Sequence, residues 1–160
     1  MDRKQELEVE KEIEQRIARL YWHIDHREFE KAVEVYTEDA ELIAMGIQMR
    51  GRTEILEALK PALGKGTIRH VVTNLVIDVI NYQNAKCNFY TTVYYNQDTE
   101  FETMDSAIPF EGPNRTHDIQ DDWLCTKEGW RITRRTGATI FNREIGKPTR
   151  LEDWAKSANK

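Results

Sequence analysis

Apolar residues recur at helical spacing near the start of the chain. They follow an i, i+4, i+7, i+8, i+11 pattern opposite a face of charged and polar residues, at Ile13, Ile17, Leu20, Tyr21 and Ile24. This pattern predicts a helix from about residue 3 to about residue 26. A shorter helix is predicted over residues 28–36, with an apolar side formed by Phe29, Ala32, Val33 and Tyr36.

A small hairpin and a third helix are predicted next. Residues 40–45 and 48–50 alternate around Gly46 as two short strands, after a break in the pattern at residues 37–39. The third helix begins at Thr53, and Gly64 and Gly66 end it.

From residue 68 the pattern changes to long runs that are typical of β-strands. They cover residues 68–80, 85–96, 115–126 and 130–141, and the short turns at residues 81–84 and 127–129 predict hairpins. We expect a longer loop at residues 98–114 and one turn of helix at residues 151–155. Helices followed by an antiparallel meander predict a single α+β domain over residues 1–142, with a C-terminal tail over residues 143–160.

The first long strand predicts how the two faces of the sheet differ. One face mixes polar and apolar side chains, namely His70, Val72, Asn74, Val76 and Asp78. The other face is more apolar and carries Val71, Thr73, Leu75, Ile77 and Val79. If the helices cover the mixed face, they can enclose a pocket there, and the apolar face then needs another cover. We therefore expect a homo-oligomer, a dimer or a trimer.

Composition narrows the classes of partner. The chain has 160 residues, 28 acidic and 23 basic, so its net charge of -5 argues against a nucleic-acid partner. No apolar run approaches the roughly 18 residues that cross a bilayer, so we expect no membrane partner. The charged first residues lack the apolar stretch of a secretory signal, which favours the cytoplasm. Cys87 and Cys125 lack Cys-x-x-Cys spacing, so we expect free thiols rather than a metal or redox site.

Two residues are candidates for chemistry. Asp25 falls four positions after Tyr21, near the apolar stripe, where a carboxylate is costly unless it is paired; the alternative is a helix end that frays into water. His70 lies on the mixed strand face, where a structural histidine is the alternative. His23 and His26 lack a third metal ligand, and we expect both at the surface. His117 can face either the interior or solvent.

Motifs for other chemistry are missing. The chain has no Gly-x-Ser-x-Gly elbow, no phosphate-binding glycine-rich loop and no dinucleotide fingerprint. We therefore expect side chains alone to do any chemistry, without a metal or another cofactor.

Several segments together resemble one family. They are YWHIDHREF at residues 21–29, YTEDA at 36–40, MRGRTEI at 49–55, HVVTN at 70–74 and GWRITRR at 129–135. As a set they resemble the SnoaL-like branch of the nuclear transport factor 2-like superfamily over residues 12–141. The resemblance implies a cone-shaped α+β barrel, in which a curved antiparallel sheet packs against three helices.

Within that superfamily, the chain is similar to scytalone dehydratase, bile acid dehydratase and hexachlorocyclohexane dehydrochlorinase, which are cofactor-free eliminating enzymes. Asp25 and His70 match an Asp at the end of the first helix and a His at the start of the strand after the third helix. Arg135 matches an Arg that follows the last-strand Trp motif in the dehydrochlorinase. The resemblance implies a lyase that acts on a small, mostly apolar cyclic substrate.

In this interpretation His70 removes a carbon-bound proton and Asp25 orients its ring. Catalysis also needs donors for developing negative charge, and the candidates are Tyr21, Asn74, Tyr90 and Arg135. The superfamily leaves alternatives open: a ketosteroid-type isomerase, a polyketide cyclase, or a non-catalytic binding or assembly subunit such as a ring-hydroxylating dioxygenase small subunit. An interior filled by aromatic side chains would favour the last of these.

Overall fold

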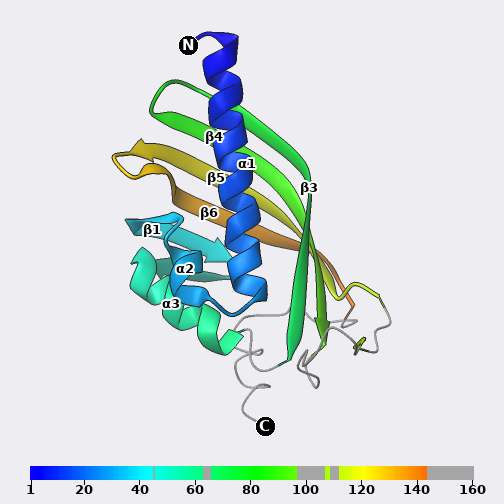
Figure 1. Cartoon of the computed structure of the whole chain (residues 1–160). Helices are drawn as coiled ribbons and strands as arrows, with labels where there is room; N and C mark the ends of the chain where they lie inside the picture. The colour runs from blue at the N-terminus through cyan, green and yellow to red at the C-terminus, as the bar shows by residue number, and fades with distance from the viewer. Residues whose placement is uncertain (45, 63–65, 97–106, 109–111, 144–160) are drawn as a thin grey trace.

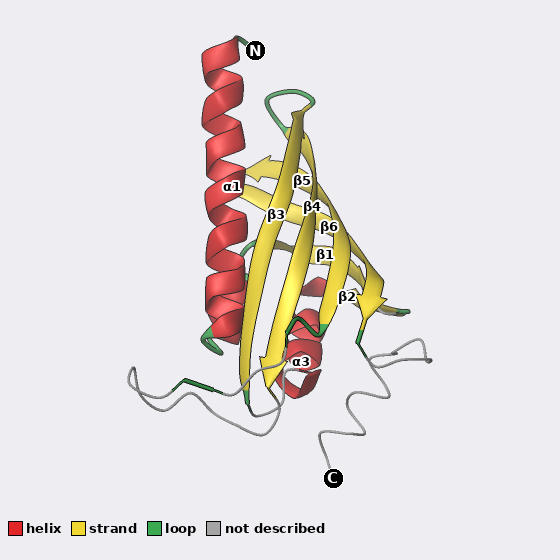
Figure 2. Cartoon of the chain, turned by 90° about the vertical axis from the view of Figure 1, so that its right-hand side faces the viewer, coloured by secondary structure: helices red, strands yellow, loops and turns green. Residues whose placement is uncertain are grey.

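The described part of the chain folds into a curved sheet with three helices on one side (Figures 1 and 2). The computed structural model describes residues 1–44, 46–62, 66–96, 107–108 and 112–143. In chain order the elements are α1 (Arg3–Asp25), α2 (Phe29–Val33), β1 (Tyr36–Ala44), β2 (Ile47–Arg50), α3 (Gly51–Ala62), β3 (Thr67–Val79), β4 (Asn84–Asn96), β5 (Arg115–Thr126) and β6 (Gly129–Asn142). The predicted α+β class is confirmed.

The six strands form one sheet in the order β2-β1-β6-β5-β4-β3. The four later strands form the predicted antiparallel meander, whereas β1 pairs with β6 in parallel. The sheet is curved but not closed, because β2 and β3 are its two edges. Figure 2 shows α1 along one side of the sheet, and no helix of the described residues lies on the opposite side.

Helix α1 begins and packs as the sequence pattern predicts. The Asp2 carboxylate accepts a hydrogen bond from the backbone N–H of Gln5, and the Gln5 side chain accepts one from the Asp2 N–H, which together form a capping box. The five residues of the predicted apolar stripe are all buried. They pack α1 against the core, whose largest fully buried side chains include Trp123 and Phe89.

The second helix is shorter than expected. The sequence predicted helix over residues 28–36 and a break at residues 37–39, but α2 ends at Val33 and β1 begins at Tyr36. Tyr36 pairs with Ile132 of β6, and the backbone N–H of Ile132 donates to the carbonyl of Val35 at 2.8 Å. Pairing to a distant strand therefore overrides the local helical pattern at these residues.

The side chains of strand β3 do not alternate between the two faces of the sheet as the sequence predicted. A β-bulge falls between Thr73 and Val76, and Asn74 adopts a left-handed conformation with φ of 54°. The extra residue reverses the side-chain alternation, so Leu75 and Ile77 pack against the core together with Val72. The predicted continuous apolar face does not exist.

Three expectations fall wholly or partly outside the described residues. These are the glycine-rich end of the third helix, most of the loop at residues 98–114 and the turn of helix at residues 151–155. In the described part, Cys87 is buried and Cys125 exposed, and neither forms a disulfide. No helix among the described residues is long and apolar enough to cross a membrane.

Candidate active site

Asp25 and His70 meet where the end of α1 crosses the first residues of β3. The Nδ1 atom of His70 lies 2.6 Å from Oδ1 of Asp25, and the backbone N–H of His70 donates to Oδ2 at 2.9 Å. Both side chains are nearly buried, with exposed fractions of 11% for His70 and 9% for Asp25. The carboxylate therefore holds the ring and the backbone of one residue at once.

This contact fixes the tautomer of the imidazole. An ionised carboxylate only accepts hydrogen bonds, so Nδ1 carries the proton and Nε2 of the neutral ring is the acceptor. Within the described residues Nε2 has no hydrogen-bond partner. The arrangement thus presents one lone pair that can receive a proton.

Local contacts hold the end of α1 against β3. Arg27, which follows the helix with φ of 60°, donates to the carbonyl of Gly66. Arg69 donates to the carbonyl of Asp25 at 3.3 Å. Tyr21, one turn before Asp25, places its ring centroid 4.9 Å from that of His70. The i, i+4 spacing on the helix therefore brings the phenol and the carboxylate to the same imidazole.

A second buried carboxylate belongs to the same interior. Asp121 on β5 accepts two hydrogen bonds from Arg135 on β6, at 2.7 and 2.6 Å, and both residues are at least 95% buried. Burial raises the pKa of the Asp121 carboxyl, and the positive charge of Arg135 opposes this rise. Burial acts to lower the pKa of Arg135, but the nearby Asp121 carboxylate outweighs it and raises that pKa.

Aromatic rings surround the Arg135 guanidinium. Its central carbon lies 5.8 Å from the ring centroid of Tyr21, 5.7 Å from that of Tyr36 and 5.5 Å from that of Phe89. Burial raises the pKa values of both Tyr21 and Tyr36, so both phenols keep their protons at neutral pH. These rings connect the Asp121–Arg135 pair to the His70 side of the interior.

His117 lies on the inner side of β5, which answers the question that the sequence left open. Its Nδ1 atom is 3.0 Å from Oγ1 of Thr139. Burial lowers the pKa of His117 to about 4, and the charges of Arg115 and His70 lower it further. His117 is therefore neutral at pH 7. It lies close enough to the Asp25–His70 pair for a charge on His70 to act on it.

The structure brings together only part of the expected set. Tyr21 and Arg135 lie with Asp25 and His70, whereas Asn74 is exposed at the bulge and Tyr90 is 48% exposed on the outer side of β4. The sequence analysis missed Asp121, Tyr36 and the inward side of His117. The sequence did carry a signal for Asp121 and His117. Every second side chain of a strand points to the same face, so both residues share the face of the apolar Ile119 and Trp123 on β5.

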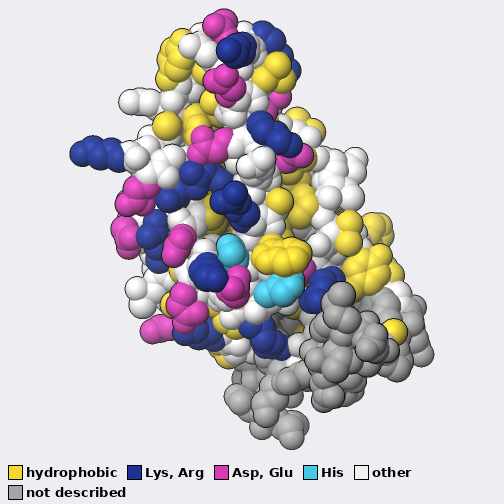
Figure 3. Space-filling model, viewed as in Figure 1, with side chains coloured by type: hydrophobic (Ala, Val, Ile, Leu, Met, Phe, Trp, Pro, Cys, Tyr) yellow, Lys and Arg dark blue, Asp and Glu magenta, His cyan; other side chains and the backbone are white. Residues whose placement is uncertain are grey.

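The other two histidines serve local contacts. The Nδ1 atom of His23 lies 2.6 Å from Oε2 of Glu28, and His26 stacks on Trp22 with ring centroids 4.1 Å apart. In the part of the chain that the structure describes, no three His, Cys, Asp or Glu side chains gather as metal ligands do. On the face that α1 crosses, basic and acidic side chains are interspersed (Figure 3).

The sequence model of the SnoaL-like domain matches residues 5–136. The chain belongs to the SnoaL-like family. No curated protein matches it in sequence. Solved structures share the fold of this SnoaL-like chain at low identity. One is an NTF2-like protein with a cystatin-like fold from Novosphingobium aromaticivorans, 20% identical with a TM-score of 0.69, covering 99% of this chain and 93% of the other.

Two further structures extend this comparison. A putative scytalone dehydratase from Novosphingobium aromaticivorans is 17% identical with a TM-score of 0.68, and 89% of each chain is covered. A protein of unknown function from Mycobacterium tuberculosis is 19% identical with a TM-score of 0.73, covering 97% of this chain and 90% of that one. The chain therefore has the SnoaL-like fold, which is similar to NTF2-like structures. The sequence resemblance is confirmed.

Proposed function

We propose that this SnoaL-like protein is a cofactor-independent lyase in which His70 removes a carbon-bound proton. The observation that carries the proposal is the contact of His70 with Asp25. It fixes the proton on Nδ1 and leaves the Nε2 lone pair without a partner among the described residues. Asp25 then stabilises the imidazolium that forms, because its negative charge lies 2.6 Å from the ring nitrogen.

A dehydration then needs no other acid. The C–H electron pair forms the new C=C bond while the C–O bond breaks, and the proton on Nε2 is transferred to the departing hydroxyl, which leaves as water. His70 ends the cycle neutral, with its proton still on Nδ1. General base catalysis of this kind contributes about 10² to 10⁴-fold in rate.

Tyr21 is the proposed donor to a substrate oxygen on which negative charge develops. Its phenol keeps its proton because burial raises its pKa, and its ring lies against His70. Arg135 contributes positive charge nearby, although Asp121 compensates much of it. The rings of Tyr21, Tyr36 and Phe89 favour a small, mostly apolar cyclic substrate.

A non-catalytic binding subunit is the second candidate. It is favoured by the burial of the interior rings, since Phe89 is 1% exposed and Tyr36 is 3% exposed. In that case the Asp25–His70 contact would only fasten α1 to β3.

Proton exchange separates the two candidates without knowledge of the natural substrate. The protein would be incubated in D₂O with cyclic ketones and cyclic β-hydroxyketones, and deuterium incorporation next to the carbonyl and enone formation would be followed by NMR. We expect wild type and the His26→Ala control to catalyse exchange, because His26 lies outside the pair. His70→Ala should lose it. Equal exchange by wild type and His70→Ala would overturn the proposed base.

The proposal includes a homo-oligomer that covers the outer side of the sheet. Exposed apolar side chains gather there on β3 and β4, including Val71, Val76 and Tyr90, which are 45%, 54% and 48% exposed. Light scattering at micromolar concentration should give the mass of a dimer or trimer. A monomer under these conditions would contradict this part.

A further inference from the structure

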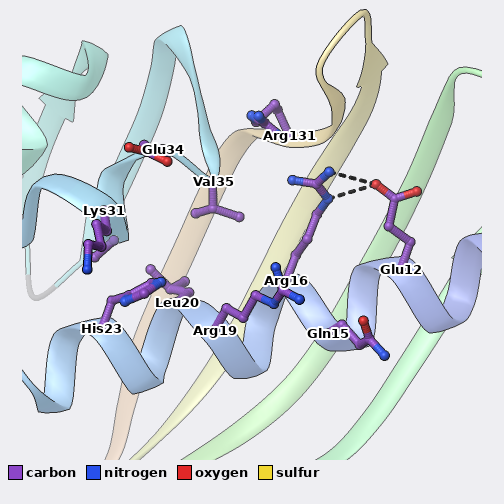
Figure 4. A pocket seen from close by; sticks show the side chains of 11 residues that line it. Glu12, Gln15, Arg16, Arg19, Leu20, His23, Lys31, Glu34, Val35 and Arg131 are labelled. Atoms are coloured by element: carbon purple, nitrogen blue, oxygen red, sulfur yellow. Dashed lines mark hydrogen bonds and ion pairs between the residues drawn. The ribbon is translucent and has the colours of Figure 1, made fainter. Parts of the chain in front are cut away.

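A groove of about 240 Å³ opens between α1, the end of α2 and the start of β6 (Figure 4). At 3.6 residues per turn its α1 residues lie on a different face of the helix from Tyr21 and Asp25. Its α1 side is built from residues spaced three or four apart, which include Arg16, Arg19 and His23. Because these positions lie on another face of the helix, the groove is separate from the Asp25–His70 pair.

Positive charge exceeds negative charge along this groove. Four of the lining residues are cations and two are carboxylates, and the cations are Arg16, Arg19, Lys31 and Arg131. Lys31 is paired with Glu28 at 2.6 Å, and Arg16 with Glu12 at 2.7 Å. Arg16 also reaches the β5–β6 turn, where it donates to the carbonyl of Glu128 at 3.3 Å. Arg131 is paired with Glu128 at 3.5 Å, so Arg19 is the lining cation that has no ion pair among the described residues.

Arg131 is poorly compensated where it stands. Its Nε atom is buried without a hydrogen-bond partner among the described residues, and its ion pair with Glu128 is long, at 3.5 Å. Burial lowers the pKa of Arg131; the positive charges of Arg16 and Arg52 lower it further, and the carboxylates of Glu128 and Glu34 oppose this. A negative group in the groove would relieve this repulsion.

Arg19 contributes unpaired N–H donors on the α1 side of the groove, opposite Arg131. It is exposed and makes no ion pair or hydrogen bond within the described residues. Its guanidinium keeps all five N–H donors, in a planar arrangement that fits phosphate and carboxylate oxygens. In Figure 4, Arg16 and Arg19 extend from α1 while Arg131 lies on the β6 side.

We propose that this groove binds a small multivalent oxyanion, the phosphate group of a free ion or of a small phosphomonoester, between Arg19, Arg16 and Arg131. Arginine is the side chain best suited to such oxygens, because it forms paired charge-assisted hydrogen bonds. The volume is below the roughly 300 Å³ at which pockets for drug-sized ligands begin, so it suits a phosphate group rather than a nucleotide. The site is independent of the proposed elimination.

Titration calorimetry with inorganic phosphate, at constant ionic strength set with NaCl, tests this site on the full chain. Wild type should bind saturably. Arg19→Gln should weaken binding about tenfold, because it removes a charge-assisted contact without breaking any pair. Lys4→Gln, an equal charge change near the start of the same helix, is the matched control and should bind as wild type does.

The charge reversal Arg19→Glu and a chemical-shift map complete the test. Arg19→Glu should abolish binding while its circular dichroism stays that of wild type, and phosphate should shift the backbone amide signals of His23 and Arg131. Tighter binding of glycerol phosphate than of phosphate would assign the site to an ester, and equal binding to the free ion. No saturable binding of either, equal weakening in Lys4→Gln, or shifts confined to other residues would overturn the proposal.

Discussion

Two carboxylates in the interior are each held by two donors, yet they prepare different chemistry. Asp25 accepts from the ring and backbone of His70 at 2.6 and 2.9 Å, and Asp121 accepts from two nitrogens of Arg135 at 2.7 and 2.6 Å. The imidazole can lose and gain a proton near neutral pH, whereas the guanidinium stays charged. The donor, not the carboxylate, therefore decides whether a pair can transfer protons or only hold a fixed charge.

The largest effect is expected where the proton-transfer pair is broken. Asp25→Asn should lower the rate of proton exchange by about 10²-fold or more, because an amide cannot stabilise the imidazolium. The double variant with His70→Ala should be little worse than His70→Ala alone, since the two residues act as a unit. Exchange rates of the two single variants and the double variant check this. Effects that multiply would show that the two residues act separately.

The fixed-charge pair should affect stability more than rate. Asp121→Asn leaves the Arg135 charge buried without a partner, and we expect a loss of about 3–5 kcal/mol in the free energy of unfolding. Replacing both residues, Asp121→Leu with Arg135→Met, should recover most of that loss. Urea unfolding is the measurement.

The more exposed ion pair between Glu41 on β1 and Arg134 on β6, 2.9 Å apart, provides a control for that result. Glu41→Gln should cost much less stability than Asp121→Asn, because solvent screens the pair. A loss as small in Asp121→Asn would mean that burial does not distinguish the two pairs.

His117 is a third test of the comparison, because it is a histidine on the inner face that contacts no carboxylate among the described residues. Its pKa in the folded protein is about 4, below the ordinary value of 6.5, so the unfolded chain takes up the proton first as the pH falls. Its contribution to stability is complete above pH 6.5 and is lost between pH 6.5 and 4.

The variant His117→Gln should therefore flatten the pH dependence of the free energy of unfolding, by at most about 1.4 kcal/mol per pH unit. Thermal or urea unfolding across pH 4 to 7 gives the profile. Thr139→Val, which removes only the hydrogen bond to the ring, should keep the wild-type slope. A His117→Gln profile parallel to that of wild type would refute the assignment.

The smallest effects are expected on the outer side of the sheet. Tyr90→Phe should leave proton exchange within about twofold of wild type, because no interior group depends on its hydroxyl. Asn74→Val should cost about 1–2 kcal/mol in stability, since a β-branched residue resists φ of 54°, whereas Asn74→Gly should cost less. Unfolding and exchange assays measure both. A large loss of exchange in Tyr90→Phe would place Tyr90 in the site.

Patterns along the chain were sufficient for the elements that depend on local spacing. The helical stripe from Ile13 to Ile24 predicted α1, and the long alternating runs predicted β3 to β6 within one or two residues. These succeed because a helix or strand that buries one face must repeat its apolar residues at that period. The i, i+4 spacing likewise placed Tyr21 and Asp25 together on one helix.

Only the tertiary structure decided which side chains meet. Residues 36–39 became strand because β6 offered a partner, and the bulge at Asn74 reversed the faces of β3, which no local pattern requires. The meeting of Asp25 with His70, 45 residues away, depends on the packing of α1 against β3, and the meeting of Asp121 with Arg135 depends on the register of β5 and β6. Sequence fixes the period of burial within an element, but contacts between elements depend on register, bulges and packing, which are set by the whole chain at once.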